Sequence, residues 1–169
     1  MFRRPRQRDF DAELEAALAA LATAGEWVRL ADTKAAILAA SMAALLVGWL
    51  GVAVDSANAA SGEFEGFFQL AVLLGLASSV VALIVAASSL HASTKHVGPP
   101  NEFSWPHVAR NGLRPEGPHR DHARQAWLQY EQLSRIASRK YARFNVALGF
   151  AVGGLVLLSA SLMPYIVNG

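Results

Sequence analysis

The chain has 169 residues, of which 53% are hydrophobic and only 17% charged, and its formal net charge is +2. This composition is too apolar for an ordinary soluble protein of one-domain length, and the hydrophobic residues are gathered in blocks. The absence of cysteine excludes disulfides, thiol catalysis and thiolate metal sites.

The first 34 residues combine a basic start with an amphipathic pattern. Acidic residues follow the first arginines, at the predicted start of a helix, where the positive end of the helix dipole favours them. From Asp9 to Lys34 no strong helix breaker interrupts the pattern, so we expect one helix that continues into the next segment. Its apolar residues recur three or four apart: Phe10, Leu14, Ala17, Leu21, Ala24 and Val28.

Three runs without Asp, Glu, Lys or Arg follow, at residues 35–54, 67–90 and 144–166. Each is long enough to cross a bilayer core, which takes about 20 helical residues. Buried helices of a soluble bundle are usually shorter and have a polar face. A cleaved signal peptide also fits poorly, because its apolar region spans only about 7–15 residues. We therefore predict an all-α integral membrane protein with three transmembrane helices.

Small residues recur along all three predicted spans, mostly at a spacing of four. In lipid, such faces let helices approach closely, within one chain or between chains. We expect them to pack helices and the protein to form a homo-oligomer. The residues are Ala36, Ala40, Ala44 and Gly48 in the first span, Ala71, Gly75 and Ser79 in the second, and Gly149 and Gly153 in the third.

The basic residues predict the orientation. All 15 Lys and Arg residues lie before the first span or between the second and third, and the short loop at residues 55–66 has none. Basic segments beside spans stay in the cytoplasm, so we expect the N-terminus inside and the C-terminus outside. A basic inner face is the normal result of membrane insertion and does not indicate nucleic-acid binding.

The predicted cytoplasmic segment at residues 91–143 begins as a proline-rich loop and ends as a second amphipathic helix from His119. Its stripe is Trp127, Tyr130, Ser134, Ala137 and Tyr141. This helix runs into the third span, as the first one runs into the first span. We favour packing of the two cytoplasmic helices against each other or against other copies. The alternative is that either helix lies flat among the lipid headgroups.

The sequence indicates no catalytic or metal site. Four of the five histidines lie in or beside the proline-rich loop, whereas a zinc site needs rigidly held ligands. No Ser–His–Asp order, phosphate-binding glycine loop or carboxylate pair stands out. We expect neither an enzyme nor a protein with a cofactor.

Asp32 and Lys34 lie where the first helix leaves water. A lysine in this place is usually an interfacial anchor. Asp32 needs a partner beside an anionic leaflet, and Arg29, Arg139 or Lys140 can supply it.

Two segments resemble the transmembrane Pycsar effector proteins. They are "ADTKAAIL" at residues 31–38 and "QLSRIASRKYARFNVAL" at residues 132–148, in a matching order of elements over roughly residues 20 to 166. The resemblance implies an inner-membrane effector of bacterial anti-phage defence, which senses cyclic CMP or cyclic UMP from a companion cyclase and impairs the membrane. It supplies no ligand-binding residues, and the chain has no recognisable cyclic-nucleotide-binding β-domain.

A cyclic nucleotide offers one phosphate charge and a flat base, which suit Lys or Arg and an aromatic face. From residue chemistry we therefore hypothesise a ligand site with Asp32, Lys34, Arg139, Lys140 and Tyr141. Two other functions remain open: a ligand-independent, holin-like pore former, and a membrane scaffold subunit.

Overall fold

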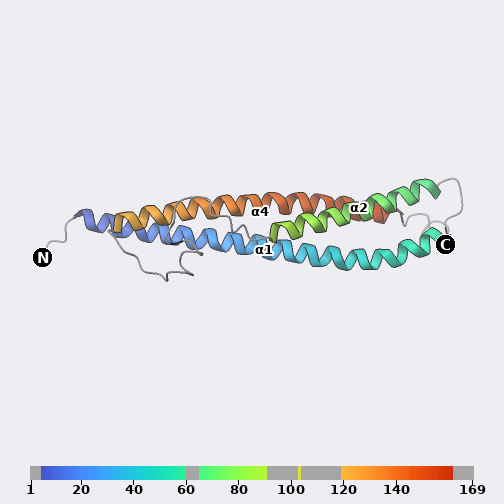
Figure 1. Ribbon diagram of the computed structural model, residues 1–169, viewed down its shortest axis with the longest axis horizontal. Coiled ribbons are helices and arrows are strands. Elements are labelled where there is room, and N and C mark those ends of the chain that lie inside the picture. Colours follow the sequence, from blue (N-terminus) through green and yellow to red (C-terminus); the bar gives the residue numbers. More distant parts are fainter. Residues whose placement is uncertain (1–4, 60–64, 91–102, 104–118, 162–169) are drawn as a thin grey trace. The chain divides into compact units, whose positions relative to one another are not determined.

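The described part of the protein consists of three long helices, which are drawn in Figure 1. The computed structural model describes residues 5–59, 65–90, 103 and 119–161. Helix α1 spans Pro5–Ala59, α2 spans Glu65–Leu90 and α4 spans His119–Ser161. Each contains a stretch long and apolar enough to cross a membrane. For the described residues, these findings confirm the prediction of an all-α protein with three helices able to span a bilayer.

Helices α1 and α4 are uninterrupted over 55 and 43 residues. Each therefore runs from a polar segment through an apolar one, as the lack of breakers predicts. Gly25, inside α1, has open space where a Cβ would be, so no close contact requires a glycine there. Helix α1 extends past residue 54 into the segment expected as a loop. Most of the predicted proline-rich loop and the end of the third run lie outside the described residues.

The chain forms two compact units. The first comprises residues 1–31 and 93–140, and the second comprises residues 32–92 and 141–169. Helices α1 and α4 each contribute residues to both units.

In the first unit, the N-terminal parts of α1 and α4 lie side by side and run in the same direction (Figure 1). Alanines fill the seam, because their small side chains allow a close approach. In α1 the buried alanines are seven residues apart, with half-buried Leu14, Leu21 and Val28 between or beside them, as in a coiled coil. This agrees with the predicted stripe of α1. The buried alanines are Ala17, Ala24, Ala31, Ala123, Ala126 and Ala137.

The predicted stripe of the second amphipathic helix is partly wrong. Trp127 is 39% exposed, whereas Ala123 and Ala126 are buried. The Trp127 ring instead meets the edge of Tyr130 on the same helix, with centroids 5.6 Å apart and planes at 87°. Aromatic residues dominate a hydrophobicity pattern, but close helix packing selects the smallest side chains, so the buried face lies to one side of the aromatic stripe.

In the second unit, α2 packs antiparallel to α4. The Ser78 hydroxyl donates to the Phe150 carbonyl at 2.8 Å, and Arg143 Nη1 donates to the Ser88 carbonyl at 3.2 Å, so higher numbers in α2 meet lower numbers in α4. Among the α2 residues whose burial is described, the buried ones are all small. They are Ala71, Gly75, Ser79, Ala82, Ala86 and Ser89.

The closest approach of α2 and α4 is at two glycines. A Cβ on Gly75 would lie 2.7 Å from Leu158 Cγ, and one on Gly154 would lie 2.8 Å from Ser79 Oγ. The Ser79 hydroxyl is satisfied within its own helix by the Gly75 carbonyl at 2.8 Å. Helix α1 joins this pair through Met42, which belongs to one core cluster with Ala82 and Ala151.

The small residues singled out in the sequence divide into two groups. Gly75 and Ser79 lie in the α2–α4 contact, where their partner in α4 is Gly154. Nothing lies within 4 Å of a Cβ on Gly149, and for Gly153 the nearest atom is Ser78 Oγ at 3.9 Å. In the first span, the four small residues are exposed: Ala36, Ala40, Ala44 and Gly48.

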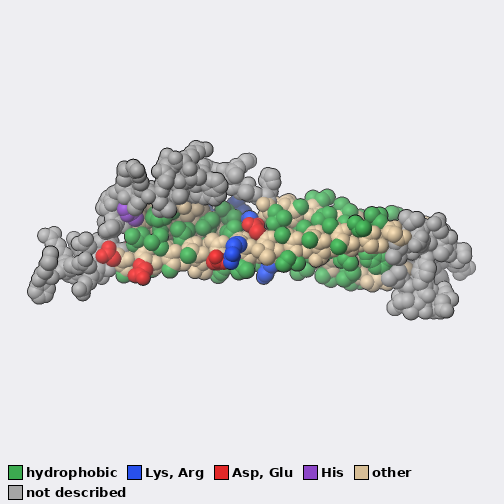
Figure 2. Space-filling model, turned by 90° about the horizontal axis from the view of Figure 1, so that it is seen from below, with side chains coloured by type: hydrophobic (Ala, Val, Ile, Leu, Met, Phe, Trp, Pro, Cys, Tyr) green, Lys and Arg blue, Asp and Glu red, His purple; other side chains and the backbone are tan. Residues whose placement is uncertain are grey.

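The outer surface of the second unit suits lipid. Large apolar side chains project from its helices, among them Val47 at 73% exposed and Leu73 at 64%. Figure 2 shows hydrophobic and uncharged side chains over the span-forming helices on the face that it presents. In water such a surface would be unfavourable, and in hydrocarbon it is the expected one.

Candidate functional site

The candidate site begins at the charged turn of α1 that precedes the first span. Arg29 contacts Glu26 through two nitrogens, with Nη2 at 2.9 Å and Nε at 3.2 Å from Glu26 Oε2. Both side chains are well exposed, so this ion pair contributes little to stability. The sequence analysis considered Arg29 as a partner for Asp32. It did not identify Glu26, one turn before Arg29, as a partner of Arg29.

Lys34 and Tyr141 meet across two helices. The Lys34 ammonium lies 5.4 Å from the centroid of the Tyr141 ring, which is within the range of a cation–π contact. Lys34 is exposed and Tyr141 is half-buried. The sequence hypothesis placed both residues in one site although they are far apart in the chain, and the structure brings this pair together.

The other hypothesised residues are distributed differently. Asp32 belongs to the second unit with Lys34 and Tyr141, whereas Arg139 and Lys140 belong to the first unit. Successive helical residues are rotated by roughly 100°, so Arg139, Lys140 and Tyr141 point in three directions around α4. In agreement, Arg139 is exposed and Lys140 is half-buried. Arg139 and Lys140 therefore leave α4 in directions that differ from that of Tyr141.

Arg143 is a functional candidate that sequence reasoning did not select. Its guanidinium donates to the carbonyl of Ser88, in the last turn of α2. The last four carbonyls of a helix lack partners within the helix, and positive charge is favourable there. Helix α2 has no basic residue in its own last turn, so α4 provides the charge. That missing basic residue is the sequence signal that could have identified Arg143.

The contacts of Tyr141 and Arg143 lie on different sides of α4. Two residues correspond to a rotation of roughly 200°, so these side chains leave the helix in nearly opposite directions. Tyr141 contacts α1 through Lys34, and Arg143 contacts α2 through Ser88. Just before its apolar part, α4 thus contacts α1 through Tyr141 and α2 through Arg143. We call this position the Lys34–Tyr141 level.

This level offers cations and an aromatic face. A lysine or arginine can bind a phosphate by charge-assisted hydrogen bonds, and a tyrosine ring can stack on a base. Within the described ranges, no group of three His, Cys, Asp or Glu residues is placed to hold a metal ion. The arrangement is therefore suited to binding an anionic aromatic ligand.

Comparison with known families identifies the chain. The model of the Pycsar effector protein domain matches residues 16–165, nearly the whole sequence. The chain therefore belongs to the Pycsar effector family, which confirms the resemblance seen in its two sequence segments. No curated protein and no solved structure matches it. Family membership makes it a transmembrane effector of anti-phage signalling that acts with a companion cyclase.

Proposed function

Because the chain is a Pycsar effector, we propose that a cyclic pyrimidine nucleotide, cCMP or cUMP, activates it and that the active form impairs the bacterial inner membrane. The family match and the three helices able to span a membrane support this proposal. The distribution of Lys and Arg supports a cytoplasmic N-terminus and a periplasmic C-terminus. With this orientation, the Lys34–Tyr141 level faces the compartment in which the cyclase makes its product.

The observation that carries the proposed ligand site is the Lys34–Tyr141 contact. The phosphate of a cyclic nucleotide would bind the Lys34 ammonium, and its base would stack on the Tyr141 ring. These two interactions would replace the single cation–π contact between Lys34 and Tyr141. Asp32 can accept a hydrogen bond from the base. Arg139 and Lys140 adjoin Tyr141 in the chain and stay in the proposed set as sources of positive charge.

The energies indicate how such a switch would have to work. An exposed cation–π contact contributes about 0.5–1 kcal/mol. Moving a population from 1% to 99% active requires about 5.5 kcal/mol of ligand preference for the active form. Separation of Lys34 from Tyr141 is therefore a small part of the total. The phosphate contacts, and several ligands bound to one homo-oligomer, would supply the rest.

Proteoliposomes loaded with a self-quenching dye test the proposal. We expect dye release with cCMP or cUMP, and none with 5′-CMP, 5′-UMP or cAMP. Lys34→Ala and Tyr141→Leu should lose the response, whereas Tyr141→Phe, which keeps the aromatic face, should retain it. The double variant Arg139→Ala/Lys140→Ala should also lose the response but still insert.

Arg135→Ala is the matched control, because it removes one positive charge from an exposed site on α4 that already pairs with Glu131. It should respond like the wild type. Release without any nucleotide would instead favour a ligand-independent pore former. No release under any condition, with a stoichiometric protein partner, would favour a scaffold subunit.

A further inference from the structure

Arg143 is held in place where the apolar part of α4 begins. Its guanidinium donates to the Ser88 carbonyl, and the side chain is exposed. A guanidinium has five N–H donors, so this bond leaves most of them for other acceptors. Among the described residues no carboxylate pairs with Arg143, whereas Arg29 and Arg135 each form an ion pair with an acid of their own helix. Arg143 therefore offers donors and a positive charge to an anionic group.

Apolar side chains continue from this contact along the boundary between α2 and α4. The two helices are antiparallel, so both lead away from the Arg143–Ser88 contact into their apolar parts. On each helix, the residues three and seven positions from the contact lie on the same side as the contact. All of them are apolar, and we call them the outer strip: Val81, Val85, Val146 and Phe150.

The outer strip is open to the surroundings of the protein. Val81, Val146 and Phe150 are exposed, and Val85 is half-buried. Its two sides are in contact, since the Ser78 hydroxyl donates to the Phe150 carbonyl. Seven helical residues rise about 10 Å, which is roughly a third of a bilayer core. An acyl chain can lie along the strip over that length.

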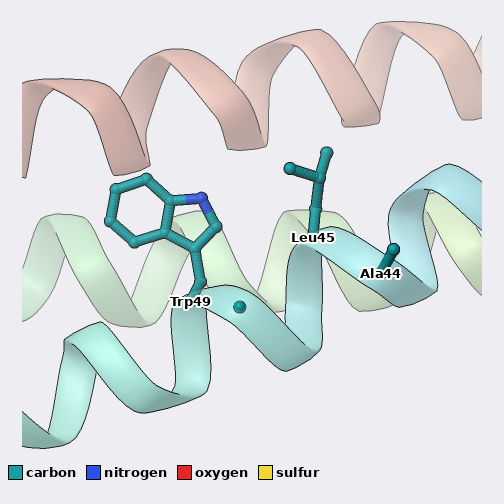
Figure 3. Close-up of a pocket in the computed structure, with 4 residues that line it drawn as sticks. Ala44, Leu45 and Trp49 are labelled. Carbon is teal, nitrogen blue, oxygen red and sulfur yellow. The ribbon is translucent and has the colours of Figure 1, made fainter.

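The hollow on α1 provides a comparison. It is open, has a volume of about 330 Å³ and is lined by Ala44, Leu45, Gly48 and Trp49. Figure 3 shows Leu45 and Trp49 rising from α1 towards α4, beside the position of Ala44. None of the four lining side chains is charged, so lipid tails can fill this hollow without any selection of the headgroup. The outer strip differs because a guanidinium lies at its end.

From these observations we propose that Arg143 and the outer strip form a binding site for an anionic phospholipid. Arg143 donates charge-assisted hydrogen bonds to the phosphate, and the acyl chains lie along Val81, Val146 and Phe150. A zwitterionic lipid carries its own cation beside the phosphate. Since no described acid neutralises Arg143, the site favours a lipid with a net negative charge, such as phosphatidylglycerol.

The lipid site is separate from the proposed nucleotide site. Arg143 and Tyr141 leave α4 in nearly opposite directions, and Lys34 contacts α4 on the Tyr141 side. The lipid site requires only that α2 and α4 cross a bilayer. It goes beyond the proposed function, because it exists whether or not a nucleotide activates the protein.

Native mass spectrometry of the full-length protein in detergent tests the lipid site. The protein is mixed with dioleoyl phosphatidylglycerol or dioleoyl phosphatidylcholine, which have the same acyl chains and differ in the charge of the headgroup. The dissociation constant of the first bound lipid is measured. We expect the wild type to bind phosphatidylglycerol about fivefold more tightly, the usual effect of one basic residue on the attraction to anionic lipid.

Two arginine variants show whether Arg143 causes this preference. Arg143→Ala should bind the two lipids equally. Arg135→Ala is the matched control, because it removes an exposed arginine of the same helix that already pairs with Glu131. It should keep the preference of the wild type.

A second pair of variants leaves the Arg143–Ser88 contact in place. Val146→Asp adds an acid one turn after Arg143 on the same side of α4, where it pairs with the guanidinium and repels a phosphate. The preference for phosphatidylglycerol should disappear. Asn145→Asp adds the same charge at an exposed position of nearly equal depth, rotated by roughly 200° from Arg143, and should keep the preference.

Equal binding of the two lipids by the wild type would overturn the proposal. A preference that persists in Arg143→Ala or in Val146→Asp would overturn it as well. Displacement of phosphatidylglycerol by an excess of inorganic phosphate would mean that the site takes free phosphate instead of a lipid. Since no nucleotide is present in this assay, none of these outcomes bears on activation by cCMP or cUMP.

Discussion

Gly75 and Leu158 fit against each other with no room for a single added carbon, since a Cβ on Gly75 would lie 2.7 Å from Leu158 Cγ. We expect Gly75→Ala to destabilise the second unit by about 1–3 kcal/mol, the usual effect of overpacking. The measurement is thermal unfolding in detergent, followed by circular dichroism. Gly149→Ala is the control, because nothing lies within 4 Å of its Cβ, and it should be neutral or slightly stabilising. Equal loss in both variants would contradict the α2–α4 contact.

The alanine seam of the first unit leads to a second prediction. Ala24 is only 2% exposed, so Ala24→Leu would force α1 and α4 apart and should cost about 1–3 kcal/mol. Ala22→Leu adds the same side chain at an exposed position and should have little effect. Limited proteolysis of α1 in native membranes distinguishes the two variants. If Ala24→Leu resisted proteolysis as well as Ala22→Leu, α1 and α4 would not pack closely at Ala24.

Arg143 should hold the end of α2. In Arg143→Ala, the Ser88 carbonyl loses its donor, and the last turn of α2 should open more often. A hydrogen bond to a charged group contributes about 1.5–3 kcal/mol, so amide exchange in that turn should accelerate roughly tenfold or more. Arg139→Ala removes an exposed arginine of the same helix and should leave this exchange unchanged. Equal exchange in all three proteins would show that Arg143 acts only as an interfacial anchor.

The orientation can be tested with two further cysteines. We expect Ser61→Cys, in the segment between α1 and α2 that has no Lys or Arg, to react with a membrane-impermeant maleimide in intact spheroplasts. Thr23→Cys, in the N-terminal half of α1 that this orientation places in the cytoplasm, should react only after the membrane is opened. The reverse labelling pattern would place the Lys34–Tyr141 level outside the cell and would remove the basis for sensing a cytoplasmic nucleotide.

Part of the candidate site was predictable from residue types alone. Lys34 and Tyr141 were selected because a cation and an aromatic ring near the membrane surface suit a nucleotide, and the structure brings them together. Arg143 was not selected, since its importance depends on the carbonyl of Ser88, which is 55 residues away in the chain. A hydrogen bond to a backbone carbonyl leaves no trace in the identity of the residue that accepts it.

The sequence by itself determined three apolar runs and the continuity of α1 and α4, because hydropathy and the absence of helix breakers are local properties of the chain. It also determined the buried stripe of α1 in the first unit, where contact with water distinguishes one side of a helix from the other. Only the tertiary structure decided how the spans use their small residues. Lipid is as apolar as leucine and favours no side of a span. Gly154 rather than Gly149 contacts α2, and this depends on the shape of the α2 surface at Gly75 and Ser79.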